Sequence, residues 1–409
     1  MKNNLLDEKH IGISVSETDE RIVLPIGDGN EPFTVYKIKI DELYYNDQND
    51  RIATYMSQYK QENHVNEINM DNLEEYNAIM HKFIVDSNPK EIERTKTSIK
   101  LNGQKKVAVV LADGRVIDGN RRFTCLRNLQ EETGEPKYIK AAILKHDFDQ
   151  NKKDIKRLEL SLQFGEEKPV DYDKIDRLVG IYKTLVEDKM FTEDEYVKCM
   201  NGNVSKAEIK KEIAKAKIMN DFLEFINAKG KYHIAKKMNL NDALEELYKT
   251  LKSIRDEDRK MSIKDIAFAN ILMQAQGDSA RKEIRSINAI VNSKYEAEYI
   301  DSCEEELERV FELIDSCEEV NEQTINDKIR TNDNLRKDMQ RLNEKYKSRS
   351  DGEKNRNEQL KAVRNAFNSL DNIDVNIVDR LNEEEKTKIL EQLNLIDDIV
   401  EKLRGHLDV

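Results

Sequence analysis

Five consecutive residues carry the side chains and the spacing best suited to chemistry on a phosphate. They are Asp118, Gly119, Asn120, Arg121 and Arg122, and apolar residues follow at helical spacing. The two arginines should therefore lie on the first turn of a helix, where unpartnered backbone N–H groups favour anions. Guanidinium groups match phosphate oxygens, and a glycine lets the backbone approach without an obstructing Cβ. The pattern predicts a phosphate-bearing ligand, although paired arginines also occur as a solvated face or as salt-bridge partners.

Two short strands should lead into this turn. Residues 107–111 are an unbroken apolar run typical of a buried strand, Asp113-Gly114 is a hairpin signal, and the return strand begins at Val116. We expect a helix over residues 90–101 that ends at Asn102-Gly103, and a further strand over residues 138–144. Nearer the N-terminus, strands over 21–26 and 33–40 should flank a turn at 27–30, and residues 52–88 should form one or two helices, such as 73–85.

In this order the elements resemble the N-terminal domain of ParB/sulfiredoxin-fold proteins. ParB-type partition proteins carry a helix ending in Ser-Ile…Gly-x-x-x-Pro, then a strand pair and a Gly-Glu-Arg-Arg box. The resemblance covers roughly residues 33–230, about half the chain. The matching stretches here are Ser98-Ile99, Asn102-Gly103-Gln104, residues 107–111 and residues 119–122, with residues 35–43, Asn46 and Arg51 upstream and residues 158–164 downstream.

The resemblance implies a nucleotide pocket that binds a nucleoside triphosphate with Mg²⁺, CTP in preference to ATP. It would place the box residues Gly119, Asn120, Arg121 and Arg122, together with Gln104 and Arg51, around the nucleotide. Glu159 would position the metal ion. Asn120 stands where the family has an acidic residue, and Glu159 alone remains of the family's Glu-Asn-x-x-Arg element. The lack of a cysteine at position 120 argues against sulfiredoxin chemistry.

Two other functions stay open beside a nucleotide-binding, DNA-binding protein. A slow NTPase, a phosphotransferase or a nuclease on the same fold would need a general base near the phosphates, and Asp118 and Glu159 are the candidate catalytic carboxylates. A pure interaction protein with a degenerate pocket, from a mobile element or a defence locus, would bind no nucleotide at all.

The amino-acid composition restricts the kinds of partner and compartment that we expect for this protein. The net charge of −13 disfavours a chain that coats nucleic acid along its whole length, because DNA affinity depends largely on lysine and arginine. No apolar run approaches the roughly 20 residues that span a bilayer, and the first residues lack the apolar core of a signal peptide. The four cysteines form no Cys-x-x-Cys pair. We expect a cytoplasmic protein with free thiols and no membrane partner.

A local basic cluster lies in a helix-turn-helix pattern. Thr192 and Glu195 form a capping box, Asn201-Gly202-Asn203 breaks the chain, and Ser205 caps a helix expected over residues 206–220. That helix carries five lysines against two glutamates. Phosphate contact with DNA is predicted for four of them, whereas an ordinary charged bundle helix is the alternative. These four are Lys206, Lys210, Lys211 and Lys215.

The last segment could pair helices between molecules. Residues 347–358 are polar, contain Gly352, and are predicted to be a flexible linker. Beyond them, apolar residues recur by four and three from Ile389 to Leu407, the spacing of a coiled-coil seam. Because the pattern lasts under three heptads, a homodimer through the C-terminal helices competes with packing inside one chain.

The expected fold is an α+β N-terminal ParB/sulfiredoxin-like domain with a small mixed sheet, followed by an all-α helix-turn-helix-like domain and an α-helical C-terminal region. All five prolines precede residue 170, which favours helix beyond that point. The expected divisions are an N-terminal arm with the first hairpin strand over 1–32, the nucleotide domain over 33–150 with its helical insertion at 52–88, the helix-turn-helix-like domain over 151–230, a helical region over 231–346, and the linker with C-terminal helices over 347–409.

Overall fold

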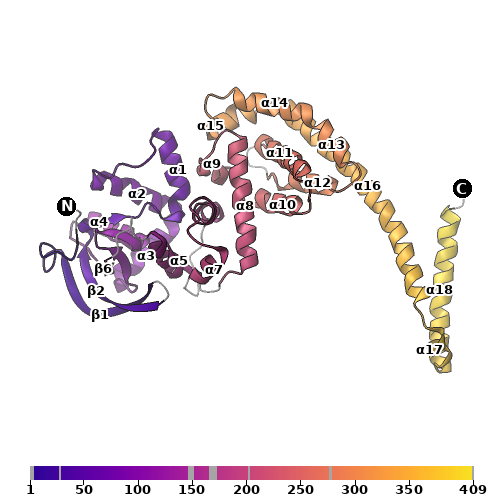
Figure 1. The fold of residues 1–409 in the computed structure, drawn as a ribbon, viewed down its shortest axis with the longest axis horizontal. Coiled ribbons are helices and arrows are strands. Elements are labelled where there is room, and N and C mark those ends of the chain that lie inside the picture. Colours follow the sequence, from indigo (N-terminus) through magenta and orange to yellow (C-terminus); the bar gives the residue numbers. More distant parts are fainter. Residues whose placement is uncertain are drawn as a thin grey trace. The chain divides into compact units, whose positions relative to one another are not determined.

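The computed structural model describes residues 4–26, 29–145, 152–164, 173–200, 203–275 and 279–407. Contacts divide the chain into two compact units, Met1–Glu344 and Lys345–Val409. Within the first unit, a mixed sheet lies in the N-terminal part and helices form the remainder, as the sequence predicts (Figure 1). None of the described helices is both long and apolar enough to cross a membrane.

A six-stranded sheet organises the N-terminal part, in the order β1-β2-β6-β4-β5-β3. β1 pairs with β2, β2 with β6, and β4 with β5 in antiparallel fashion, whereas β4–β6 and β3–β5 are parallel. The predicted hairpins are confirmed, and the first is longer than expected; its turn residues 27 and 28 lie outside the described residues. The strands are β1 Val15–Ile26, β2 Gly29–Lys39, β3 Tyr44–Tyr45, β4 Ala108–Leu111, β5 Arg115–Asp118 and β6 Tyr138–Leu144.

Both faces of the sheet are covered, which explains the unbroken apolar run at β4. Because side chains alternate along a strand, Ala108 and Val110 join one core while Val109 and Leu111 join the other. The first core is closed by α2 (Leu73–Ser87), α3 (Pro89–Asn102) and α4 (Asn120–Thr133). The second is closed by α5 (Lys152–Phe164), through Ile155 and Leu158.

The helix end predicted at Asn102-Gly103 and the helices predicted within residues 52–88 are confirmed. α3 ends where Gly103 adopts φ 68°, and its N–H bonds to the carbonyl of Ile99. Residues 52–88 form two helices, α1 (Ala53–Glu62) and α2, after a short 3₁₀ turn, η2 (Asp50–Ile52). The segment that bears Arg51 is thus joined to a helical insertion that packs over the first core.

The rest of the first unit is helical. The predicted capping box of Thr192 with Glu195 is present, and the predicted cap Ser205 forms a second capping box with Glu208. α8 continues beyond the expected end at residue 220 because Phe222 and Leu223 are buried. The residues 201 and 202, predicted as part of the turn between α7 and α8, lie outside the described residues. The helices are α6 Lys174–Ile181, with a π-helical segment Tyr182–Glu187 after it, α7 Glu193–Cys199, α8 Lys206–Phe225, α9 Tyr232–Lys237, α10 Asn241–Lys252, α11 Glu257–Met273, α12 Arg281–Ile290, α13 Glu296–Ser302, α14 Glu304–Asp315 and α15 Glu322–Thr324.

The prediction of a flexible linker over residues 347–358 is wrong. This stretch lies inside one continuous helix, α16 (Asp333–Asp371). A single interior glycine costs a helix only about 1 kcal/mol relative to alanine, and Gly352 stands among lysine, arginine and glutamate, which are good helix formers. The second unit consists of the end of α16, α17 (Val375–Asp379) and α18 (Glu383–Leu407).

Candidate functional site

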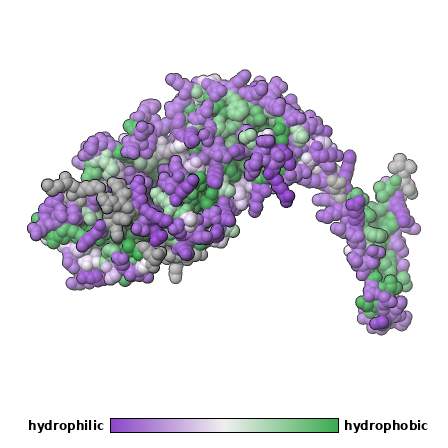
Figure 2. Space-filling view, in the orientation of Figure 1, coloured by the Kyte–Doolittle hydropathy of each residue, from purple (hydrophilic) through white to green (hydrophobic). Residues whose placement is uncertain are grey.

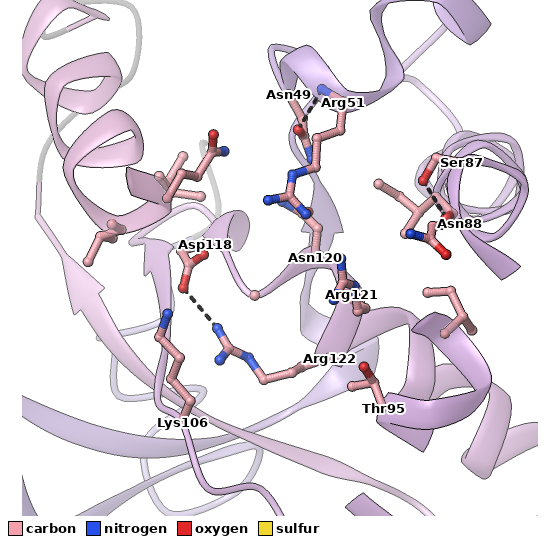
Figure 3. A pocket seen from close by; sticks show the side chains of 16 residues that line it. Asn49, Arg51, Ser87, Asn88, Thr95, Lys106, Asp118, Asn120, Arg121 and Arg122 are labelled. Carbon is pink, nitrogen blue, oxygen red and sulfur yellow. Dashed lines mark hydrogen bonds and ion pairs between the residues drawn. The ribbon is translucent and has the colours of Figure 1, made fainter. Parts of the chain in front are cut away.

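A cavity of about 270 Å³ opens at the turn between β5 and α4 (Figure 3). It gathers residues from η2, the α2–α3 junction, α3, the β4 approach, α4 and α5. The sequence motif therefore forms one wall of a real cavity. Its polar and charged lining consists of Asn49, Arg51, Ser87, Asn88, Thr95, Lys106, Asp118, Asn120, Arg121, Arg122 and Gln163, with Gly119 at the turn.

Gly119 is required at this turn for two reasons. Its φ is +104°, a left-handed conformation that side chains disfavour. A Cβ built there would lie 2.8 Å from the Cβ of Ala108 and 3.1 Å from a guanidinium nitrogen of Arg122. As the residue preceding α4, Gly119 also offers no side-chain acceptor to the first turn of the helix. The helix N-terminus therefore faces the cavity without a side-chain cap, which favours an anion.

Four cations converge on the cavity from different parts of the chain. Arg51, Lys106, Arg121 and Arg122 line it with a single carboxylate, Asp118, for a formal balance of +3 among the described lining residues. Figure 3 shows Arg51 reaching across from η2 toward the two arginines of α4. Burial and then the neighbouring Arg51 lower the pKa of Arg121. Like charges crowded in a partly buried space create a site for a negative ligand.

Each arginine of α4 has one acidic neighbour. A terminal nitrogen of Arg122 donates to Asp118 at 2.8 Å, and a terminal nitrogen of Arg121 lies 3.6 Å from a carboxylate oxygen of Glu91. Two buried atoms nevertheless lack any partner: Nε of Arg122 and Oδ1 of Asn120. Buried polar atoms are nearly always hydrogen-bonded, so these two are available to a ligand or a bound water. The site would suit a ligand that supplies an acceptor to Arg122 and a donor to Asn120.

The turn that carries Arg51 is held in place by contacts of Asn49 and Asp50. The side chain of Asn49 accepts from the backbone N–H of Arg51 at 3.1 Å. Asp50 accepts from Nζ of Lys156 at 2.8 Å, and its carboxylate packs so tightly on Gly180 that a Cβ there would lie 2.5 Å away. The turn that carries Arg51 is thus anchored to α5 and α6.

Glu159 does not line this cavity. It is 3% exposed, and its carboxylate accepts from Lys156 at 3.2 Å and from Gln163 at 3.1 Å. It borders a neighbouring cavity of about 470 Å³ together with Asp50 and Lys156. Burial raises the pKa of Glu159, opposed by the charge of Lys156. The structure therefore separates the two candidate catalytic carboxylates, since Asp118 lines the first cavity and Glu159 the second.

Gln104 also lies outside the lining of the cavity. Its side-chain amide donates to the carbonyls of Lys140 and Lys106 at 2.7 and 2.8 Å, and its oxygen accepts from the N–H of Lys140 at 2.7 Å. These bonds tie the segment before β4 to β6. Gln104, which the motif predicts at the nucleotide, thus stabilises the sheet instead of lining the cavity.

The four lysines predicted to meet DNA all have carboxylate partners. Lys206 lies 2.8 Å from Asp194 and Lys210 lies 3.8 Å from Glu193, both on α7. Lys211 and Lys215 share Glu245 of α10, and Lys215 is also buried. The structure does bring these lysines onto one helix, but it does not leave them as an unmatched basic surface.

Sequence reasoning missed several residues of the cavity. Asn88 caps α3 by accepting from the N–H of Glu91, and Thr95 lies further along that helix. Lys106 precedes β4, and Gln163 lies one turn after Glu159. Only Lys106 carried a usable signal, because a cation directly before a buried strand that enters a phosphate-binding turn is well placed to face the ligand. The others depend on how α3 and α5 pack.

Comparisons with known proteins yield little. No family model matches the chain, and no curated protein matches its sequence. One solved structure, described as a Pnob8-like ParB-N domain, is similar to it, with 14% sequence identity and a TM-score of 0.32. That match covers 69% of this chain and 97% of the other. What the cavity binds is therefore inferred from the residues that line it.

Proposed function

We propose that the cavity binds a nucleoside triphosphate through its phosphates, CTP in preference to ATP. The observation that carries the proposal is the convergence of Arg51, Lys106, Arg121 and Arg122 on an uncapped helix N-terminus, with Nε of Arg122 buried and unpartnered. Arginine forks and free backbone N–H groups are standard partners of phosphate oxygens. The preference for cytosine comes from the ParB/sulfiredoxin resemblance in the sequence.

The residues that line the cavity are better suited to binding a ligand than to catalysing a reaction of it. Asp118 is the one carboxylate among the described lining residues, and it already accepts from Arg122. A general base must instead be within reach of the proton that it removes and be able to accept it. Glu159, the other candidate, is paired inside the fold. A ligand-binding protein, or a nucleotide-controlled switch, is thus the function that these contacts support.

The test is a thermal-shift panel of CTP, ATP, GTP and UTP on the wild type and on Arg121→Ala. A ligand that binds only the folded state stabilises it by about 2.7 kcal/mol at a concentration 100 times its dissociation constant. We expect a shift with one nucleotide that is lost in Arg121→Ala. Arg94→Ala is the matched control, because the side chain of Arg94 is 82% exposed on α3. No shift with any nucleotide would contradict the proposal.

We also propose that the second unit forms a homodimer. Among its described side chains, none beyond Ser350 is buried, and apolar residues of both long helices stay exposed, including Phe367 at 64% and Ile399 at 58%. Figure 2 shows apolar side chains gathered along these C-terminal helices. A pair of helices with no buried core is marginal alone, because helix stability in proteins comes mostly from packing an apolar face.

The occupant that fits this face is a second copy of the same unit. Residues 345–371 carry seven basic and four acidic side chains, whereas α18 carries four basic and seven acidic ones. A two-fold interface can place the basic helix of one copy against the acidic helix of the other, and bury the apolar faces between them. Sedimentation velocity across a concentration series should show a dimer that Leu393→Glu dissociates and the control Glu384→Gln does not. A monomer at all concentrations would contradict this part.

A further inference from the structure

Beside the phosphate cavity, an ammonium group lies between the buried carboxylate of Glu159 and the partly buried carboxylate of Asp50. Nζ of Lys156 lies 2.8 Å from Oδ2 of Asp50 and 3.2 Å from Oε2 of Glu159. The three side chains are 11%, 15% and 3% exposed. Burial lowers the pKa of Lys156, but the charges of Asp50 and Glu159 outweigh it, and the net shift is upward. The lysine therefore stays charged.

Such a pair of carboxylates is the kind of site that a divalent cation uses. Mg²⁺ in nucleotide sites is held by one or two carboxylates together with the phosphates, at short and nearly octahedral distances. Here Lys156 already fills that position for Asp50 and Glu159. Asp118, which lines the phosphate cavity, is bound to Arg122.

These three carboxylates are thus already paired with cations of the chain and do not fit the Mg²⁺ expected from the sequence. We infer that the nucleotide binds without a divalent cation, with Lys156 in place of a cation between Asp50 and Glu159. The inference rests on the proposed nucleotide function and deepens it. The negative charge of the phosphates is met by Arg51, Lys106, Arg121 and Arg122 directly.

Lys156 acts as a positioning residue through both of its partners. Asp50 precedes Arg51, so the Lys156–Asp50 contact fixes the turn from which Arg51 enters the cavity. Glu159 accepts from Gln163, which lines the cavity from α5. One ammonium group therefore helps to position two lining residues from different elements, η2 and α5, which a mobile hydrated ion would do less rigidly.

The first experiment is calorimetric titration of the full-length wild type with the nucleotide that gives the largest thermal shift, in EDTA and in excess Mg²⁺. We expect dissociation constants that agree within about twofold, or a tighter value in EDTA, since Mg²⁺ coordination reduces the negative charge of the ligand. A gain of about tenfold or more with Mg²⁺ would overturn the inference and leave nucleotide binding intact. Absence of binding in both buffers would overturn the proposed function and this inference with it.

A second experiment removes the ammonium group. Lys156→Met keeps the length of the side chain but leaves Asp50 and Glu159 facing each other, and we expect the variant to gain stabilisation by Mn²⁺ alone, without nucleotide. Its nucleotide affinity should fall by about tenfold in EDTA because Arg51 and Gln163 lose their anchor. Lys152→Met, an exposed position on the same helix, should gain no response to Mn²⁺. A folded Lys156→Met protein that ignores Mn²⁺ would contradict the role of Lys156 in place of a cation, and the wild-type titration decides the question if the variant does not fold.

Discussion

This acidic chain contains two groups of basic residues that the sequence mostly assigns to phosphate contact, one around the cavity and one on α8. The structure arranges their charges differently. The four cations of the phosphate cavity come from three places, η2, the segment before β4 and the first turn of α4, and share a single lining carboxylate. Four of the five lysines of α8 meet carboxylates of α7 and α10. The first arrangement gathers four cations around one lining carboxylate and leaves two buried atoms, Nε of Arg122 and Oδ1 of Asn120, without a hydrogen bond, whereas the second spreads its lysines over carboxylates of two other helices. Convergence of basic side chains on one cavity therefore marks the candidate anion site better than their number does.

The pKa shifts of two lysines express the same contrast. Burial, reinforced by Arg122 and Arg51 against the pull of Asp118, lowers the pKa of Lys106. A hydrogen bond to Asp194 raises the pKa of Lys206. An anion that binds beside a cation with a depressed pKa favours the charged form and raises that pKa. Lys106 therefore has more to gain from a bound anion than Lys206, whose pKa is already raised by Asp194.

The largest effect is expected from Arg122→Ala. The substitution removes the fork that would hold the phosphate and leaves Asp118 unpaired in the cavity as a repelling charge. Loss of a charged hydrogen bond costs about 1.5–3 kcal/mol, so nucleotide affinity should fall by at least about tenfold. Titration calorimetry measures it, with Arg122→Lys retaining part of the affinity. Unchanged nucleotide affinity in Arg122→Ala would contradict the proposal that the first turn of α4 binds the phosphates.

Gly119→Ala should come next, and it acts on stability as well as on binding. The added Cβ meets Ala108 and Arg122 at a backbone conformation of φ +104°, which should cost about 1–3 kcal/mol in the free energy of unfolding. Urea denaturation gives the value. Gly134→Ala is the matched control at the other end of the same helix, because it has φ +67° but nothing within 4 Å of the added Cβ. Equal losses in both variants would show that the crowding at Gly119 does not matter.

A smaller effect concerns pH. The depressed pKa of Lys106 means that this side chain begins to lose its proton below the usual lysine pKa of 10.5. Nucleotide affinity should therefore weaken as pH rises toward that value, since the neutral amine no longer attracts phosphate. Lys106→Arg should flatten this part of the profile, because arginine stays protonated. A profile that is identical in wild type and variant would place Lys106 outside the ligand's reach.

The smallest effect is expected from Lys210→Glu in α8. If the ion pairs with α7 already neutralise this helix, affinity for a DNA duplex should change by no more than about 1 kcal/mol, with little change in its dependence on salt. Filter binding across a salt series measures both quantities. A large loss of DNA affinity, with a salt slope reduced by about one, would show that Lys210 is available to DNA despite its ion pair and would support the predicted DNA contact.

Local signals in the sequence were sufficient for most of the elements, but not for the helix through residues 347–358 and not for the partners of individual side chains. The strand, hairpin turn and helix start around Gly119 were predictable because each depends on a few adjacent residues, and so were the capping box at Thr192 and the cap at Ser205. The roles of Glu159 and Gln104 depend on groups brought in by tertiary packing, Lys156 with Asp50 in one case and the backbone of β6 in the other. The same holds for α8, whose neutralising carboxylates lie on other helices.

The cavity is assembled from residues between Asn49 and Gln163, and its parallel strand pair β4–β6 closes only after α4 has crossed between them. During synthesis, the arginines of α4 would emerge after most of the lining but before α5, which adds Gln163 and anchors the turn that carries Arg51. A chain ended before α5 would contain the whole Gly-Asn-Arg-Arg run and yet lack Gln163 and the anchor for Arg51. Nucleotide capture by chains of increasing length would thus report the moment at which this part of the protein completes its folding.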